Sequence, residues 1–308
     1  MSSSFQFGTR TIQIRVAGRT DVGLKRSENQ DSFLVVDLTN AANGGVVLEP
    51  DLKTGAAVVG EFALGDKGAV FVVADGMGGA AAGGLASNMA IACIEDELRR
   101  RWLEDRNNSP QRFAQRLKEA VEASNRKIHE TGKSDERFRG MGTTVTAVGI
   151  LEGFLYVAQV GDSRAYLLRL GKASQITRDQ SFIQHLVDAG TITEEEAERS
   201  NHRNVILQAL GTAPSVDVDL TYQEIRRNDV VVVCSDGLSK VVKAGELAER
   251  ARQFQDPAAL CDELVSLTLQ RGGPDNITVI AVRLDGAGLE EPDEGESVGR
   301  HAYSPVDD

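Results

Sequence analysis

Short apolar runs recur along the whole chain, and most of them are bounded by glycine, aspartate or asparagine. The runs are rich in β-branched and aromatic residues, which favours buried strands. The run 70–74 is typical, and it leads directly into Asp75 and a glycine-rich turn. Further strands are predicted over residues 11–18, 32–38, 141–148, 155–160, 165–170, 216–225, 229–234 and 277–284. Residues 39–68 hold only short apolar runs among glycines and alanines, which predicts a hairpin-like excursion.

Apolar residues at helical spacing predict two pairs of longer helices. These helices are expected over residues 83–101, 110–130, 244–253 and 257–270. Ser109 and Pro110 form a start signal for the second of them, as N-cap and first-turn residue. Because the strands gather between the helix pairs and do not alternate with helices, the pattern indicates an α+β fold. Two sheets packed together, with the helix pairs outside, satisfy this order.

Aspartate stands repeatedly where a predicted strand begins or ends, although aspartate is a poor strand former. The positions that share this feature are Asp31, Asp75, Asp162, Asp236 and Asp275. Carboxylates gathered at strand ends repel one another unless a cation lies among them. A single Asp-Gly pair in a chain with 31 glycines is typically a turn. The recurrence of the pattern therefore favours a shared site over separate turns.

An all-oxygen set of ligands suits Mg²⁺ or Mn²⁺ better than zinc or copper. Gly76 has no Cβ, so its carbonyl is free to approach a metal ion. Two such ions about 3.5–4 Å apart would activate a bridging water for attack on a phosphate ester. Arg26 lies on the same entry loop as Asp31, and its guanidinium is suited to hold two phosphate oxygens.

The composition excludes several other functions. A net charge of -12 over 308 residues argues against nucleic-acid and anionic-membrane partners. The three cysteines show no CxxC spacing, which argues against a zinc site or a disulfide framework. No signal region or membrane-spanning run is present, so a cytoplasmic location is expected. Ser163 has no histidine placed to activate it, and residues 76–79 match no nucleotide-binding motif.

The motifs that contain these residues resemble those of the bacterial metal-dependent serine/threonine protein phosphatases, the PP2C or PPM family. The resemblance covers roughly residues 11–284. It is carried in order by residues 26–31 (RSENQD), 74–79 (ADGMGG), 141–144 (MGTT), 160–166 (VGDSRAY), 235–238 (SDGL) and 273–278 (GPDNIT).

The resemblance implies a β-sandwich of two antiparallel sheets flanked by helix pairs. It also implies hydrolysis of phosphoserine and phosphothreonine by a water activated by two metal ions. The positions that correspond to the family's two-metal centre are Asp31, Asp75, the Gly76 carbonyl, Asp236 and Asp275. Arg26 corresponds to the phosphate-binding arginine, and Asp162 with Asp236 to a third ion site of bacterial members. Phosphorylated proteins, as a Ser/Thr kinase or its substrates, would be the partners of a monomeric enzyme.

This chain departs from the family pattern at the rim of the expected site. Gln30 stands where many members have glutamate, and Met77 where many eukaryotic members have a histidine proposed as general acid. Gln180 replaces a histidine that is common in the family's flap. Two alternatives stay open: a pseudophosphatase that only binds phosphoproteins, and a metal-dependent esterase for small phosphate compounds.

Three regions are predicted along the chain. Residues 1–10 are expected to be a flexible arm, and 11–285 the phosphatase domain. Within the domain, 179–204 is expected to form a mobile flap beside the site, built on two short helices. Residues 286–308 are acidic and predict a disordered tail.

Overall fold

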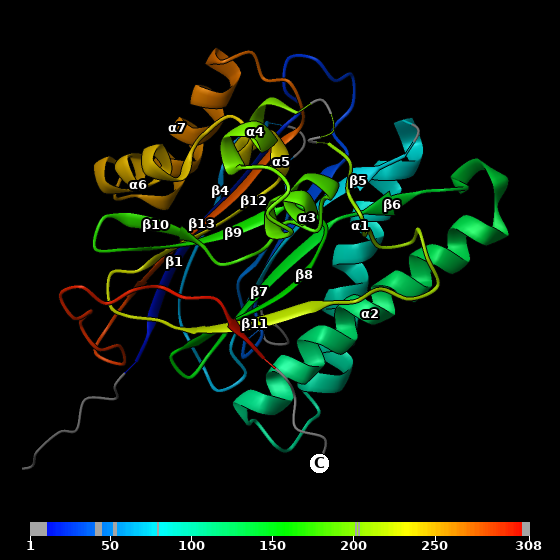
Figure 1. Ribbon diagram of the computed structural model, residues 1–308. Coiled ribbons are helices and arrows are strands. Elements are labelled where there is room, and N and C mark those ends of the chain that lie inside the picture. The colour runs from blue at the N-terminus through cyan, green and yellow to red at the C-terminus, as the bar shows by residue number, and fades with distance from the viewer. Residues whose placement is uncertain are drawn as a thin grey trace, which may run out of the picture.

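The computed structural model describes residues 11–40, 45–51, 54–78, 80–200, 202 and 204–303. Two antiparallel sheets pack face to face at its centre, with a pair of helices on each outer face (Figure 1). Along these ranges, no helix combines the length and apolar character that crossing a bilayer requires. The predicted flexible arm, 1–10, lies outside the described residues.

One sheet has six strands in the part of the chain described. Their order is β10 (Lys172–Gln175), β9 (Arg164–Arg169), β12 (Val230–Cys234), β13 (Ile277–Asp285), β1 (Gln13–Asp21) and β4 (Val58–Ala63). The second sheet runs β14 (His301–Ala302), β11 (Asp219–Glu224), β8 (Phe154–Val160), β7 (Val145–Leu151), β5 (Ala69–Met77), β2 (Asp31–Asp37) and β3 (Val47–Leu48). The two-residue strand β6 (Gly142–Thr143) pairs with the end of β5.

The helices cover the two outer faces as the sequence predicted. Helix α1 (Ala80–Glu97), continued by a π-helical turn at Leu98–Trp102, and α2 (Pro110–Ser134) lie on the second sheet. Helices α6 (Ala244–Gln253) and α7 (Pro257–Gln270) lie on the first. The Ser109 hydroxyl accepts a hydrogen bond from the Arg112 amide, which confirms it as the N-cap of α2. The shorter helices are η3 (Glu136–Phe138), α3 (Phe182–Asp188), α4 (Glu194–Arg199) and α5 (Asp236–Ser239).

Strand β5 is apolar from Ala69 to Ala74, where both of its faces are buried. Phe71 and Val73 point into the core between the sheets, while Val70 and Val72 pack under α1 and α2. A strand covered on both sides reads as a continuous apolar run. The buried core therefore holds the central strands firmly, and the residues just beyond their ends are positioned by it.

The prediction of a hairpin for residues 39–68 is wrong. Strands β3 and β4 do not pair with each other: β3 pairs with β2 in one sheet, and β4 pairs with β1 in the other. The segment instead crosses the edge of the sandwich. Its half-buried side chains Leu48, Val58 and Phe62 pack against the core between the sheets. The apolar area that they bury stabilises the crossing.

The prediction of a disordered tail is also wrong over residues 286–303. Leu289 is buried, and β14 pairs with β11 through Thr221–Ala302 and Tyr222–His301. The C-terminal segment lies along the lower part of the molecule in Figure 1, where it passes β11. A few apolar and aromatic side chains dock it despite its acidic composition. Residues 304–308 lie outside the described part of the chain.

Candidate active site

Four of the predicted aspartates meet at one end of the sandwich, two from each sheet. Asp31 opens β2 and is the register partner of Asp75 near the end of β5. Asp236 follows the end of β12, and Asp275 precedes the start of the neighbouring strand β13. In antiparallel neighbours the end of one strand lies beside the start of the next. Each pair is therefore brought together by strand pairing alone.

A cavity of about 250 Å³ lies between these strand ends. Its lining includes Arg26, Asp75, Gly76, Asp162, Asp236 and Asp275. Asp162 arrives from the end of β8, which runs in the same direction as β5 because each is antiparallel to β7. Asp31 is buried beside Asp75, with 5% of its surface exposed. The structure thus gathers all the predicted site residues in one place.

The carboxylates lie in an environment that opposes their charge. The pKa of Asp31 is raised to about 7, chiefly by burial; the nearby hydroxyls of Ser235 and Thr278 act against the rise, and the charges of Asp236 and Asp275 add to it. Burial likewise raises the pKa of Asp162 to about 7. The pKa of Asp75 is raised well above its usual range, first by burial and then by the charge of Asp31. Both carboxylate oxygens of Asp31 are buried, and neither accepts a hydrogen bond of good geometry; the nearby Ser235 and Thr278 hydroxyls only partly stabilise the charged form.

The loops around the cavity are held by one amide side chain, that of Asn276. Its Nδ2 donates to the carbonyls of Val22 (2.9 Å) and Glu28 (3.0 Å), and its Oδ1 accepts from the Gln30 amide at 2.9 Å. These bonds fasten the loop that carries Arg26 to the start of β13. The sequence marked Asn276 only as part of a motif, because its partners are backbone groups far away along the chain.

Two glycines are required by close contacts at the cavity. A Cβ on Gly76 would lie 2.2 Å from the Gly83 carbonyl oxygen and 2.6 Å from that of Gln30. A Cβ on Gly237 would lie 1.9 Å from the carbonyl oxygen of Asn276. All three distances are far inside van der Waals contact, so no larger residue fits the observed backbone at either position.

Two side-chain cations engage the carboxylates. The Arg26 guanidinium donates to both oxygens of Asp275, from Nε and Nη2, at 2.8 Å each. The Lys240 ammonium contacts Asp236 Oδ2 and lies 3.7 Å from Asp162 Oδ2. Among the residues described, no three His, Cys, Asp or Glu side chains stand arranged around a metal position. The acidic residues are gathered, but three of them, Asp162, Asp236 and Asp275, are paired with cations.

The donor set nevertheless fits a hard divalent cation. The lining offers several carboxylates, and the backbone of Gly76 is free of a side chain. Buried carboxylate oxygens without a hydrogen bond of good geometry, such as those of Asp31, are costly unless a cation or a proton satisfies them. Oxygen ligands of this kind suit Mg²⁺ and Mn²⁺.

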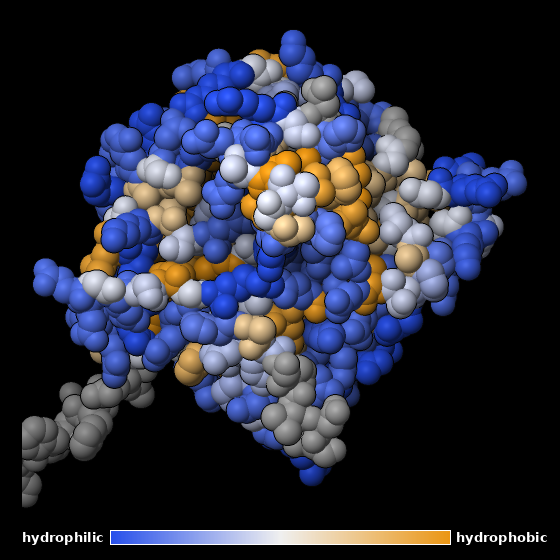
Figure 2. Space-filling model, viewed as in Figure 1, coloured by the Kyte–Doolittle hydropathy of each residue, from blue (hydrophilic) through white to orange (hydrophobic). Residues whose placement is uncertain are grey.

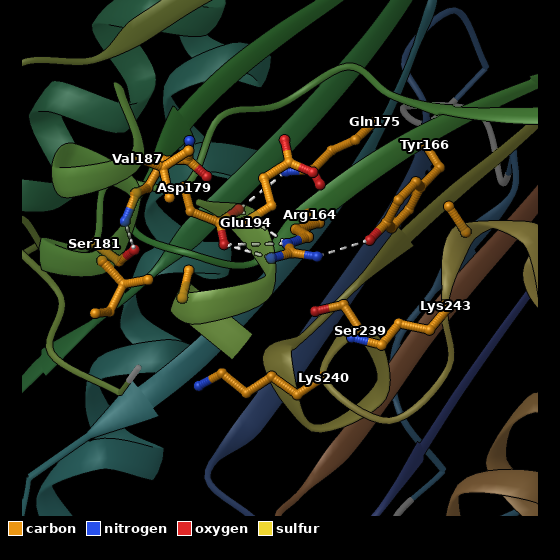
Figure 3. Close-up of a pocket in the computed structure, with 14 residues that line it drawn as sticks. Arg164, Tyr166, Gln175, Asp179, Ser181, Val187, Glu194, Ser239, Lys240 and Lys243 are labelled. Carbon is orange, nitrogen blue, oxygen red and sulfur yellow. Dashed lines mark hydrogen bonds and ion pairs between the residues drawn. The ribbon is translucent and has the colours of Figure 1, made fainter. Parts of the chain in front are cut away.

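A larger pocket of about 490 Å³ adjoins this cavity, between the flap and the start of α6 (Figure 3). On one side, the Arg164 guanidinium is bound to both oxygens of Asp179 and donates to the Tyr166 hydroxyl at 3.2 Å. On the other side lie Ser239, Lys240 and Lys243. The pocket offers both apolar and charged walls next to the aspartates.

The flap, residues 179–204, carries α3 and α4, and Gln180 ties its start to neighbouring segments. The Gly161 amide donates to Gln180 Oε1 at 2.8 Å, and the Leu207 amide donates to the Gln180 carbonyl at 2.7 Å. Thr193 and Glu196 form a capping box at the start of α4. Apolar surface gathers around the position of α3 in Figure 2, and Phe182 at its start is 36% exposed.

Sequence reasoning missed Lys240 and Asn204 as members of the site. Lys240 Nζ donates to Asn204 Oδ1 at 2.9 Å, which joins the end of the flap to the acidic cluster. One local signal existed for Lys240: it stands four residues after Asp236, the spacing at which helical side chains meet. Asn204 has no such signal, since only tertiary packing brings it near.

Comparison with known proteins shows that this chain belongs to the protein phosphatase 2C family. The family model for protein phosphatase 2C matches residues 59–278. The serine/threonine protein phosphatase PstP of Mycobacterium tuberculosis is 37% identical over 88% of this chain, which spans only 45% of PstP. The serine/threonine phosphatase Stp of Listeria innocua is 32% identical over 86% of this chain and 93% of its own length.

Among solved structures, the catalytic domain of PstP in complex with two manganese ions superposes with a TM-score of 0.70 at 33% identity. The match covers 89% of this chain and all of that domain. The two-sheet architecture predicted from the motifs is therefore confirmed.

Proposed function

Because this chain belongs to the protein phosphatase 2C family, we propose that the acidic cavity is the active site of its protein serine/threonine phosphatase activity. In this proposal, Asp31, Asp75, Asp236, Asp275 and the Gly76 carbonyl hold two divalent cations, Mn²⁺ or Mg²⁺. The observation that carries the proposal is the buried pair of Asp31 oxygens, neither of which accepts a hydrogen bond of good geometry. The manganese-bound structure of PstP supports the choice of metal.

When bound, such a pair of ions lowers the pKa of water and neutralises charge on phosphoryl oxygens. The protein supplies the carboxylates and holds them in fixed positions in a cavity. The raised pKa values of Asp31, Asp75 and Asp162 mean that cation binding must displace protons from this cluster. The firm attachment of the loops through Asn276 keeps the ligands in place.

Arg26 is placed to bind the phosphoryl group at the rim. Its side chain is 56% exposed, and its planar fork already binds a carboxylate in the bidentate manner that suits phosphate. In the proposed mechanism the guanidinium leaves Asp275 and binds two phosphoryl oxygens. Because Asp275 is also a proposed metal ligand, metal binding would free the guanidinium from Asp275 before the substrate arrives.

Protein substrates fit the surroundings better than small phosphate esters do. The adjoining pocket of about 490 Å³ provides room for side chains that flank a phosphorylated residue. We propose phosphoserine and phosphothreonine proteins, including a Ser/Thr kinase or its substrates, as partners of a monomeric enzyme. A reducing, cytoplasmic location is supported by the buried free thiols of Cys93, Cys234 and Cys261.

The test compares hydrolysis of a phosphothreonine peptide and of p-nitrophenyl phosphate in Mn²⁺, in Mg²⁺ and in EDTA. We expect turnover with metal, none in EDTA, and a higher kcat/KM for the peptide. Asp236→Asn serves as the inactive control. Turnover that persists in EDTA would overturn the metal site. Peptide binding without hydrolysis in every metal would instead indicate a phosphoprotein-binding role.

A further inference from the structure

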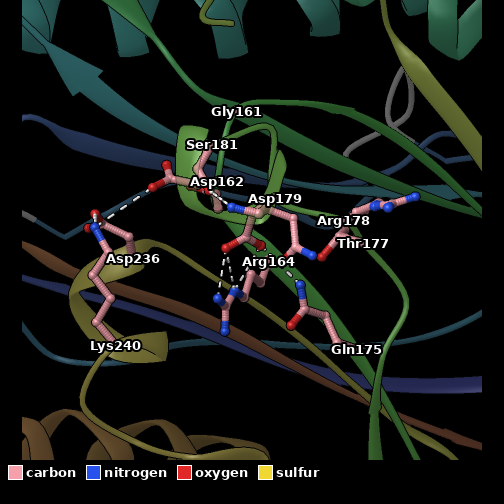
Figure 4. A network of polar contacts seen from close by, with 12 residues as sticks. Gly161, Asp162, Arg164, Gln175, Thr177, Arg178, Asp179, Ser181, Asp236 and Lys240 are labelled. Atoms are coloured by element: carbon pink, nitrogen blue, oxygen red, sulfur yellow. Dashed lines mark hydrogen bonds and ion pairs between the residues drawn. The ribbon is translucent and has the colours of Figure 1, made fainter. Parts of the chain in front are cut away.

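The ammonium group of Lys240 lies between two carboxylates of the site (Figure 4). It contacts Asp236 Oδ2 directly, and Asp162 Oδ2 is 3.7 Å away. The Lys240 side chain is only 28% exposed, and the Asp162 and Asp236 side chains are 7% and 16% exposed. A single positive charge is thus enclosed between two largely buried negative charges.

The position of this ammonium group is specified by its surroundings. The stem of Lys240 extends from the end of α5 along the wall of the larger pocket, as Figure 3 shows. Its tip leaves that pocket and reaches the acidic cluster, where Asn204 Oδ1 accepts a further hydrogen bond at 2.9 Å. Three acceptors from three segments therefore surround one ammonium group, which matches the three N–H donors of a lysine.

We propose that Lys240 is a built-in counter-ion for the Asp162–Asp236 pair and excludes a divalent cation from between them. This inference rests on the proposed metal centre and concerns the number of ions that it binds. The chain binds two metal ions, and no third ion binds between Asp162 and Asp236. An ion there would need oxygen ligands at about 2.0–2.2 Å. The ammonium group already occupies that space and would repel a second cation.

In this arrangement Asp236 can contact Lys240 and still serve as a metal ligand. Its contact with Lys240 uses Oδ2. Asp236 begins α5 directly after the end of β12, so its carboxylate also faces the cavity shared with Asp75 and Asp275. The lysine thus neutralises the outer part of the cluster, while the inner part stays available to the two ions.

The test counts bound manganese by native mass spectrometry and by isothermal titration with Mn²⁺. We expect two ions in the wild type and three in Lys240→Ala. Lys240→Gln, which keeps most of the side-chain length, replaces it if the alanine variant does not fold. Lys118→Ala is the control, because it removes a lysine charge whose partner is Glu122 on α2. It should bind two ions.

Adding Asp162→Asn to Lys240→Ala should return the count to two, because the third ion then lacks a ligand. A wild type that binds three ions, or a Lys240 variant that binds two, would overturn the inference and leave the two-metal centre intact. A wild type that binds fewer than two would overturn the proposed centre itself. The count is independent of turnover, so the two failures are distinguishable.

Discussion

Asp31 and Asp75 are direct register partners on β2 and β5, so their carboxylates share one buried edge of the second sheet. Each raises the cost of ionising the other, in addition to the cost of burial. Strand pairing forces this proximity, and without a cation the folded protein must accommodate it as a destabilising feature.

The first prediction concerns pH in the absence of metal. The pKa of Asp31 is raised from 3.8 to about 7, so the folded protein binds more protons than the unfolded chain between these values. The free energy of unfolding should therefore fall as the pH rises through this window. Thermal unfolding in EDTA should give a lower Tm at about pH 8 than at about pH 5. Mn²⁺ should raise the Tm more at the higher pH, and a Tm in EDTA that increases with pH would contradict this account.

The second prediction concerns Asp31→Asn. Removing a buried charge should increase the free energy of unfolding in EDTA at neutral pH by on the order of a few kcal/mol. The Tm should rise accordingly. The same change should remove a metal ligand and lower kcat by at least about 100-fold. Differential scanning fluorimetry with and without Mn²⁺ checks both effects. A variant that retained the wild-type response to Mn²⁺ would exclude Asp31 from the metal site.

The third prediction concerns Arg26→Ala. Loss of charge-assisted hydrogen bonds worth about 1.5–3 kcal/mol should lower kcat/KM by roughly 10–100-fold, mainly through KM. Arg26→Lys should recover only part of this loss, because an ammonium group cannot bind two oxygens in the same plane. Lys25→Ala removes an exposed positive charge from the same loop and should leave kcat/KM nearly unchanged. Equal losses in both alanine variants would point to general electrostatic attraction.

The fourth prediction compares two glycines. Gly237→Ala places a Cβ 1.9 Å from the Asn276 carbonyl oxygen, so the loop before β13 must move. It should destabilise the fold by more than about 2 kcal/mol and weaken Mn²⁺ binding. At Gly245 in α6, an added Cβ meets nothing within 4 Å. Gly245→Ala should stabilise the protein by about 0.5–1 kcal/mol. Urea unfolding measures both, and a tolerated Gly237→Ala would contradict the close contact.

The fifth prediction concerns the C-terminal segment. Arg169 is bound to both oxygens of Asp229, and its Nη1 donates to Glu296 at 2.7 Å. The Arg169 and Asp229 side chains are each 1% exposed, so Arg169→Ala leaves a buried charge unpaired. The expected loss is about 3–5 kcal/mol. Breaking the exposed Lys118–Glu122 pair by Lys118→Ala should cost less than about 1 kcal/mol. Similar losses of unfolding free energy in the two variants would show that the buried ion pairs of Arg169 contribute no more than an ion pair near the surface.

Local sequence was sufficient for most of the longer strands, the long helices and the choice of aspartates. The alternation of apolar residues sets which face of a strand is buried, and an aspartate next to such a run is visible without any partner. The motif that contains each aspartate also identified the family. These features depend on neighbours in the chain, so the amino-acid order determines them directly.

Tertiary structure alone decided three other features. Strands β3 and β4 joined different sheets, because their pairing depends on which edges were free. The acidic C-terminal segment became ordered because Arg169 and the strand β11 offered it partners that lie far away along the chain. Lys240 also lies near Asp162 and Asn204 because tertiary packing brings them to the end of α5, and its spacing from Asp236 does not specify these two contacts.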